Sequence, residues 1–433
     1  MNSLWSETTS RHIRPPLEQD TVADVLIIGG GISGILAAHK LREAGVRCIV
    51  VEGKTVGSGI TKNTTAKITA QHGLIYAGLI KRRGLEFARQ FYEVNTRAIQ
   101  QYYKLSKRFS CDFEKKTAYV YSKNDRHKIE IEANAYAKLG IKARIEENLP
   151  LPFSASVGLA MDEQAQFHPL KLLFALAEEL EIYENTFVGK IDNYTAYLAN
   201  GAKIKANHII ICTHYPMVNV PGLYFLKLFQ NRSYVIALEG APSLDGMYID
   251  EREGGNSFRT YGNLLFVGGG GHKTGKTGGG YAELEALTKQ AYPSATIKYR
   301  WAAQDCMSLD GMPYIGLHRA GQANIYTATG FNKWGMTGAM VASEIFCDLI
   351  VEGKSELKAL YSPQRSIFTP KLFTNIGAAA KGLLSVGGPR CAHMGCKLHW
   401  NSAEKSWDCA CHGSRFCESG HIIDNPAKKD IKR

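Results

Sequence analysis

The sequence lacks a long uninterrupted apolar segment. Its most apolar stretch, Val25 to Leu41, is broken by four glycines and a His-Lys pair. A membrane-spanning helix needs about 20 consecutive apolar residues, so no transmembrane segment is expected. The first twenty residues contain two arginines and two adjacent prolines but no apolar signal-peptide core. We therefore expect residues 1–20 to form a loose N-terminal leader and the protein to be cytoplasmic.

Charge of one sign is not gathered into a polybasic run, although the net charge is +12. Residues 363–433 hold eleven Lys and Arg against five Asp and Glu, so about half of the positive excess lies there. A basic face of this kind could steer an acidic protein partner, or it could be an ordinary solvated surface. The sequence contains no aromatic-basic platform and no known binding module, so nucleic acid is not an expected partner.

Cysteine is scarce over most of the chain and then abundant near its end. Five of the ten cysteines fall between Cys391 and Cys417, while the other five are scattered before residue 350. Scattered cysteines usually serve as small apolar core residues. A dense group that also contains histidines points to a metal site instead.

The chain opens with one βαβ unit and shows no internal repeat. From Thr21 the sequence gives an apolar strand, a glycine loop, a helix that ends near Gly45, and a second strand that ends at Glu52. Further helical and strand signals continue to about residue 351. They predict helices over 73–109, 125–139 and 334–351, and strands over 207–213 and 324–330.

The glycine loop of the first unit has the spacing G-x-G-x-x-G at Gly29, Gly31 and Gly34. The first glycine permits a tight turn, the second lets the backbone approach a pyrophosphate, and the third allows helix and strand to pack closely. Ile32 and Ser33 begin the helix, whose N-terminus favours the negative charge of a phosphate. These residues predict a dinucleotide site.

Glu52 ends the second strand, eighteen residues after Gly34. An acidic side chain at this place binds a ribose hydroxyl of the dinucleotide. It also repels a 2′-phosphate, so FAD or NAD fits the site better than NADP.

Two further loops resemble those of the FAD-dependent amine and amino-acid oxidoreductases related to D-amino-acid oxidase. They are the loop at Gly57–Thr61 and the turn that runs from Ala328 to Thr337. The resemblance covers roughly residues 21–360. It implies bound FAD and an α/β fold in which a Rossmann-like domain is interleaved with an α+β substrate domain.

The same resemblance implies a set of residues around FAD. It places Val188 near the adenine and Thr213, at the end of a strand, in the cofactor site. A helix that begins at Gly335–Thr337 would stabilise negative charge on a reduced flavin. The alternative for Gly330 is that it only ends a strand. The residues placed near the flavin ring are Gly59, Thr61, Thr65, Lys67, Gly330, Trp334, Gly335 and Met336.

Near the C-terminus, Cys391-x-His393 and Cys409-x-x-His412 form a set of two cysteines and two histidines. Zinc could use these ligands. The surrounding residues, CAHMGC and WDCACHGSRF, resemble the two cluster-binding loops of Rieske proteins, in which two thiolates hold one iron and two imidazoles hold the other.

The Rieske resemblance implies that Cys391 and Cys409 bind one iron and that His393 and His412 bind the other. It pairs Cys396 with Cys411 in a disulfide. It also implies that Gly413 and Ser414 donate hydrogen bonds to the cluster sulfurs, while Cys417 has no counterpart.

The Rieske fold usually has several strands before the first cluster ligand, but only about a dozen residues separate Gly377 from Cys391. We therefore expect the small all-β module to be abridged and to be supported by the flavin domain. The expected divisions are a leader over 1–20, an oxidoreductase domain over 21–362, a linker over 363–388 and a Rieske-type module over 389–433. Within the linker, the helix-like stretch 371–384 is apolar and mildly basic. We expect it to be a packed strap, with membrane-surface contact as the alternative.

Together these features predict an FAD-dependent dehydrogenase that oxidises an amine or amino acid and passes single electrons through a [2Fe–2S] cluster to an external acceptor. The alternative is an electron-transfer or redox-sensing protein without an amine substrate. A Rieske oxygenase is disfavoured because too few residues follow His412 for a mononuclear iron site. No catalytic base is assigned. The candidates are Lys67, His72, His272, Lys273 and Arg300.

Overall fold

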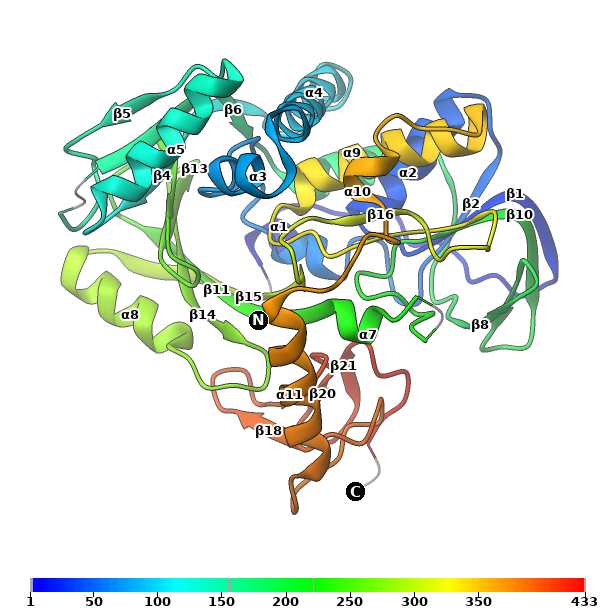
Figure 1. The fold of residues 1–433 in the computed structure, drawn as a ribbon. Coiled ribbons are helices and arrows are strands. Elements are labelled where there is room, and N and C mark those ends of the chain that lie inside the picture. Colours follow the sequence, from blue (N-terminus) through cyan, green and yellow to red (C-terminus); the bar gives the residue numbers. More distant parts are fainter. Residues whose placement is uncertain (1–2, 155–156, 221, 432–433) are drawn as a thin grey trace.

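Three β-sheets build the molecule, and the first two share the chain between residues 21 and 329 (Figure 1). The computed structural model describes residues 3–154, 157–220 and 222–431. The chain enters the first sheet, leaves it for the second, returns twice and ends in the third. The predicted interleaved α/β body with a small all-β module at its C-terminal end is therefore confirmed.

The first sheet is mainly parallel, in the order β16-β17-β10-β1-β2-β7, with the β8–β9 hairpin beside β10. The central strand β1 lies parallel to both neighbours, and its apolar residues alternate between two covered faces. Val25 and Ile27 pack in the core that includes helices α2 (Ile32–Glu43) and α9 (Gly335–Cys347). The strands are β1 (Thr21–Ile28), β2 (Cys48–Val51), β7 (Glu181–Tyr183), β8 (Val188–Asp192), β9 (Thr195–Leu198), β10 (Lys203–Ile211), β16 (Tyr314–Leu317) and β17 (Ile325–Thr329).

The second sheet, in the order β15-β11-β14-β13-β12-β4-β6-β3 with β5 beside β6, is largely antiparallel. The helical region expected over 73–109 divides into two helices at Gly84, whose φ of +88° is a left-handed conformation that favours glycine. The strands are β3 (Lys67–Ile68), β4 (Glu114–Ser122), β5 (Arg144–Glu146), β6 (Val157–Gln166), β11 (Leu228–Glu239), β12 (Gly246–Asp250), β13 (Ser257–Tyr261), β14 (Leu264–Lys273) and β15 (Thr296–Ser308). The helices around this sheet are α3 (Tyr76–Arg83), α4 (Leu85–Arg108), α5 (Arg126–Leu139) and α8 (Gly280–Ala291).

The third sheet is a four-stranded antiparallel meander that carries the cysteine-rich loops. Its strands are β18 (Leu398–Asn401), β19 (Ser406–Cys409), β20 (Arg415–Cys417) and β21 (Ile422–Asp424). Helix α11 (Pro370–Leu384) joins it to the body, and α6 (Pro169–Ala177), α7 (Tyr224–Lys227) and α10 (Lys358–Tyr361) lie in the body. Across the described ranges, no helix combines the length and apolar character needed to cross a bilayer.

The N-terminal segment, expected to be a loose leader, is anchored on the body by its first residues and by Arg11 and Leu17. Trp5 is fully buried, its indole N–H donates to the Thr64 carbonyl at 2.8 Å, and its ring meets that of Tyr261 edge-on. Arg11 forms an ion pair with the buried Glu184 at 2.8 Å. A few well-placed apolar side chains suffice for this packing, and they leave no periodic pattern in the sequence.

Buried charges join the third sheet to the second. Glu404 accepts a hydrogen bond at 2.9 Å from Nε of the buried Arg232 on β11, and another at 2.8 Å from Arg415 on β20. Arg415 also pairs with Asp408 at 3.0 Å and with Asp424 at 2.9 Å. We call these five residues the ionic clasp. Because one carboxylate serves arginines of both sheets, the small module is fixed to the body by its own charges.

Replacing Glu404 tests the clasp. In a Glu404→Ala variant Arg232 stays buried without a carboxylate, and breaking a buried pair in this way costs about 3–5 kcal/mol. We expect a lower urea midpoint for loss of the cluster absorbance. Glu285→Ala is the matched control, since its pair with Arg300 is half-exposed and such pairs contribute about 0–1 kcal/mol. Equal midpoints for the two variants would contradict the clasp.

Candidate functional site

A cavity of about 1530 Å³ lies where the carboxyl ends of β1, β10 and β17 face the second sheet and the cysteine-rich module. Dinucleotides bind at this edge of open parallel sheets. Pockets for drug-sized ligands usually measure about 300–1,000 Å³, so this cavity has room for a larger ligand.

The glycine loop at the cavity mouth requires its glycines. Gly29 has a φ of +115°, and a Cβ there would lie 2.5 Å from the Cys212 carbonyl oxygen. A Cβ on Gly34 would lie 2.0 Å from the Gly29 carbonyl oxygen, so helix α2 and the loop touch backbone to backbone. Gly31 caps α2 in extended conformation, which leaves the helix N-terminus open to the cavity. This is the local geometry that a pyrophosphate requires.

Glu52 and Thr61 hold the parts of this loop together. The Glu52 carboxylate accepts hydrogen bonds from the backbone amides of Gly30 and Lys54, both at 2.8 Å. The Thr61 hydroxyl accepts from the Ile32 amide at 3.0 Å, which ties the loop after β2 to the first turn of α2. The helix expected at the pyrophosphate and the loop expected near the flavin ring are thus joined directly.

The structure brings most of the predicted FAD-site residues to one cavity. Those that line it are Gly29, Gly31, Ile32, Ser33, Glu52, Gly59, Thr61, Thr65, Lys67, Val188, Thr213, Trp334, Gly335 and Met336. The other three lie just behind the wall: Gly34 packs on Gly29, Gly330 ends β17 with a φ of +68°, and Thr337 hydrogen-bonds His72 at 3.0 Å.

Lys67 and His72 are the only two of the five catalytic candidates that line the cavity. Burial, helped by the neighbouring Arg259, lowers the pKa of Lys67 to about 7. Burial lowers the pKa of His72 to about 3, so its ring is neutral, and it stacks on Trp334 with 4.8 Å between centroids.

The other three candidates have different neighbours. His272 hydrogen-bonds the Tyr234 hydroxyl at 3.1 Å, and Lys273 donates to the Asn375 side chain at 3.1 Å. Arg300 pairs with Glu285 at 2.9 Å. None of them lines the cavity, so their proximity in sequence to glycine-rich turns was not a guide to their position.

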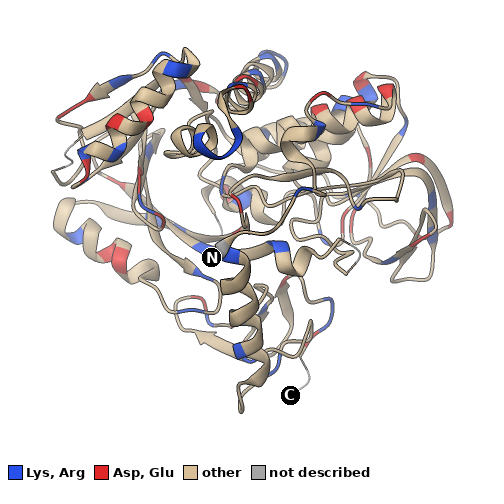
Figure 2. Cartoon of the chain, viewed as in Figure 1, with Lys and Arg blue, Asp and Glu red and all other residues tan. Residues whose placement is uncertain are grey.

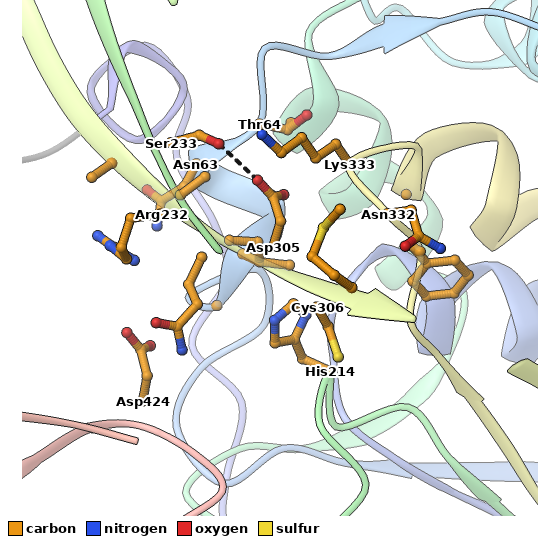
Figure 3. Close-up of a pocket in the computed structure, with 18 of the residues that line it drawn as sticks. Asn63, Thr64, His214, Arg232, Ser233, Asp305, Cys306, Asn332, Lys333 and Asp424 are labelled. Carbon is orange, nitrogen blue, oxygen red and sulfur yellow. Dashed lines mark hydrogen bonds between the residues drawn. The ribbon is translucent and has the colours of Figure 1, made fainter. Parts of the chain in front are cut away.

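Sequence reasoning missed Asp305, which projects into the cavity from β15 (Figure 3). Its carboxylate accepts a hydrogen bond from the Ser233 hydroxyl at 3.0 Å. Among the described residues it has no cationic partner within ion-pair distance, unlike the cavity carboxylates of Asp250, Glu404 and Asp424. No motif surrounds it; only the strand alternation over 296–308 could have placed it on an inward face.

The second site is a pocket of two thiols and two imidazoles in the cysteine-rich module. Cys391, Cys409 and His412 are buried, and His393 lies beside His412 with 5.1 Å between ring centroids. The Cys391 and Cys409 thiols are hydrogen-bonded, which lowers the pKa of Cys391. The Ser414 hydroxyl also lowers the pKa of Cys391. This donor set matches what a Rieske cluster requires.

The two histidines show which of their atoms face the pocket. Nδ1 of His393 and Nδ1 of His412 are both buried and have no hydrogen-bond partner in the described part of the chain. Nε2 of His393 is turned away to the Asn219 side chain, at 3.2 Å. Burial lowers the pKa of each histidine to about 4, so both are neutral, as metal ligands must be. The residues present therefore fit a [2Fe–2S] cluster.

Cys396 and Cys411 form the disulfide between the two loops, with 6.7 Å between their Cα atoms. Cys417 lies apart, half-exposed on β20, where its thiol is 2.9 Å from the Ser419 hydroxyl.

The FAD-type cavity and the cluster pocket share a wall. Tyr215 lines the cavity, and its ring lies 6.5 Å from that of His393. Asn425, in the loop after β21, donates to the Thr213 carbonyl at 2.7 Å. Two lysines make further contacts between the module and the body. Lys54 donates to the Ile423 carbonyl and Lys428 to the Gly189 carbonyl, each at 3.2 Å.

Comparison with known proteins agrees with this geometry. Residues 24–349 match the family model of the DAO-type FAD-dependent oxidoreductases, and residues 363–433 match that of the Rieske [2Fe-2S] domain. The "Putative Rieske 2Fe-2S iron-sulfur protein YhfW" of Bacillus subtilis (strain 168) is 33% identical, with 100% of this chain and 97% of that protein aligned.

Solved structures share the fold of the body. L-proline dehydrogenase from P. horikoshii aligns with a TM-score of 0.66 at 19% identity, over 80% of this chain and 98% of that one. Glycine oxidase from Geobacillus kaustophilus aligns with a TM-score of 0.67 at 18% identity, over 80% of this chain and 100% of that one.

Both resemblances seen in the sequence are thereby confirmed, and with them the expected cofactors, FAD and a [2Fe–2S] cluster. The chain belongs to the DAO family of FAD-dependent oxidoreductases and carries a Rieske domain at its C-terminal end.

Proposed function

We propose that this oxidoreductase is a dehydrogenase that oxidises the C–N bond of an amine or amino acid and delivers electrons one at a time to an external acceptor. The observation that carries the proposal is the wall shared by the two sites, where Tyr215 lines the flavin cavity and contacts the ring of His393. Bound FAD supplies two-electron hydride chemistry, and a [2Fe–2S] cluster supplies single-electron transfer.

For the cluster we propose the ligand set Cys391 and Cys409 on one iron and His393 and His412 on the other. The unpartnered Nδ1 atoms support the histidine assignment. The Asn219 amide orients the His393 ring from its far side, in the way that outer hydrogen bonds fix metal-bound imidazoles. The Cys396–Cys411 disulfide ties the two ligand loops together.

For the substrate we propose that Asp305 binds the amino group. A carboxylate without a cationic partner in a cavity is suited to an ammonium ion, and the Ser233 hydroxyl holds it in place at 3.0 Å. Asp305 can also take the proton that the amine must lose before its α-hydrogen leaves as hydride. The likeness of the body to L-proline dehydrogenase and glycine oxidase, two enzymes named after amino acids, supports an amine or amino-acid substrate.

The substrate role of Asp305 predicts a defect confined to substrate binding and oxidation. In Asp305→Asn we expect KM for the best amine to rise about 10- to 100-fold, since a hydrogen bond to a charged group contributes about 1.5–3 kcal/mol. Reduction of the flavin by dithionite should be unchanged. Asp245→Asn, at an exposed Asp paired with Lys116, is the control. An unchanged KM in Asp305→Asn would exclude this binding role.

The cluster ligands predict a clean separation of two signals. The reduced wild-type protein should give a Rieske-type EPR spectrum, and Cys391→Ser should lose it while keeping its flavin absorbance. In that variant an amine should still bleach the flavin anaerobically, but reduction of a one-electron acceptor should fall to background.

Cys417→Ser is the matched control for Cys391→Ser and should behave as wild type, because its thiol lies outside the cluster pocket. A wild-type protein that is EPR-silent and contains zinc would exclude the electron relay. If no amine or amino acid bleaches the flavin, the protein is an electron-transfer or redox-sensing flavoprotein instead.

A further inference from the structure

Helix α11 and the turn after it present an apolar stripe to solvent. The exposed fractions are 72% for Phe373, 44% for Ile376 and Leu383, 81% for Leu384 and 87% for Val386. Phe373, Ile376 and Leu383 or Leu384 follow helical spacing, so their side chains lie on one side of the helix. We call these five residues the α11 stripe.

The stripe belongs to a helix that is held firmly on its other side. Leu372 is 5% exposed, and the Asn375 side chain accepts from Lys273 at 3.1 Å. Gly382 lies so close to the disulfide that a Cβ would come 2.5 Å from the Cys411 sulfur. The expectation of a packed strap therefore holds for one side only, and the apolar side remains bare.

Three backbone carbonyls of the turn at the end of α11 accept hydrogen bonds from side chains of the module. The Arg390 guanidinium donates to the carbonyls of Leu383 at 3.1 Å and Ser385 at 2.6 Å, and the Lys397 ammonium donates to that of Val386 at 3.2 Å. A polar group that enters an apolar medium unpaired is costly. Because these carbonyls are already paired, transfer of the turn that carries Leu384 and Val386 from water into an apolar medium costs less free energy.

The part of the sequence that contains the stripe carries charge of one sign. Residues 357–403 contain six Lys and Arg and no Asp or Glu. Figure 2 shows the α11 ribbon with basic residues and no acidic ones, and Figure 1 shows its lower end protruding beside the cluster module. Lys381 flanks the stripe, and Met394, next to the proposed ligand His393, is 42% exposed. Apolar side chains beside cations, without acids, are the composition of interfacial helices on anionic lipid.

We propose that the α11 stripe docks this end of the protein on an anionic lipid bilayer. The protruding shape fits insertion among lipid head groups better than it fits a flat protein surface. Lys381, Arg390 and Lys397 then lie at the level of the phosphates, and the cluster module faces the membrane. The docking site adds to the proposed function that the electron acceptor of the cluster is held at this membrane. That addition rests on the proposed function, in which the cluster passes electrons to an external acceptor.

The test is sedimentation of the holoprotein with phosphatidylcholine vesicles, with and without phosphatidylglycerol, at low and high salt. We expect binding to the anionic vesicles, weaker binding at high salt, and little binding to phosphatidylcholine alone. Leu384→Ser/Val386→Ser and Lys381→Glu should each weaken binding about tenfold. Ile13→Ser, at an apolar side chain 83% exposed elsewhere on the body, should bind as wild type.

Three outcomes would overturn the proposal. They are no binding to anionic vesicles, equal binding by wild type and the stripe variants, and a concentration-dependent dimer that the stripe variants abolish, which would make the stripe a contact between copies. In the first of these outcomes, capture of an acidic protein would assign the stripe to that partner. EPR and amine bleaching are measured without vesicles, so failure of docking and failure of the proposed dehydrogenase are distinguished.

Discussion

The cysteine-rich module depends on the ion pair that it makes with the body, between its Glu404 and Arg232 on β11. Four short strands bury too little apolar surface to hold two cluster loops rigidly. The ionic clasp supplies the missing support, because Glu404 is shared between Arg415 within the module and Arg232 on the second sheet. A carboxylate that serves two buried arginines is costly to remove, so the module and the body behave as one unit.

That constraint also fixes the distance between the two cofactor sites. The clasp sets the module against β11 and β15, where the Gln304 side chain donates to the Gly413 carbonyl at 2.9 Å. The cluster loops then meet the loop after β10 at Tyr215 and Asn219. A tethered module on a flexible linker would sample many separations, whereas this one keeps its histidines at the wall of the flavin cavity.

The sequence allowed prediction of those parts of the site whose chemistry is local. The glycine loop, Glu52 and the two Cys/His motifs each lie within a few residues, and the motifs carry their own backbone requirements. Asp305, Tyr215 and Asn219 could not be found in this way, because each acquires its role from strands far apart in the chain.

The same limit applies to packing. The burial of Trp5 depends on its contacts with Thr64 and Tyr261. Both partners are distant in the sequence, so no pattern near residue 5 could predict that burial. For α11, the sequence indicated a helix but not which of its sides would be covered. The domain divisions and the cytoplasmic location expected from the sequence stay predictions.

The loop after β21 gives the fusion of the two domains a further meaning. Residues 422–428 line the flavin cavity, and Asn425 and Lys428 bind carbonyls at the ends of β10 and β8. The segment that completes the iron–sulfur module therefore also forms part of the wall of the flavin cavity. Separating the two domains would therefore not yield two functional proteins. The larger one would lack one side of the cavity that holds its own cofactor.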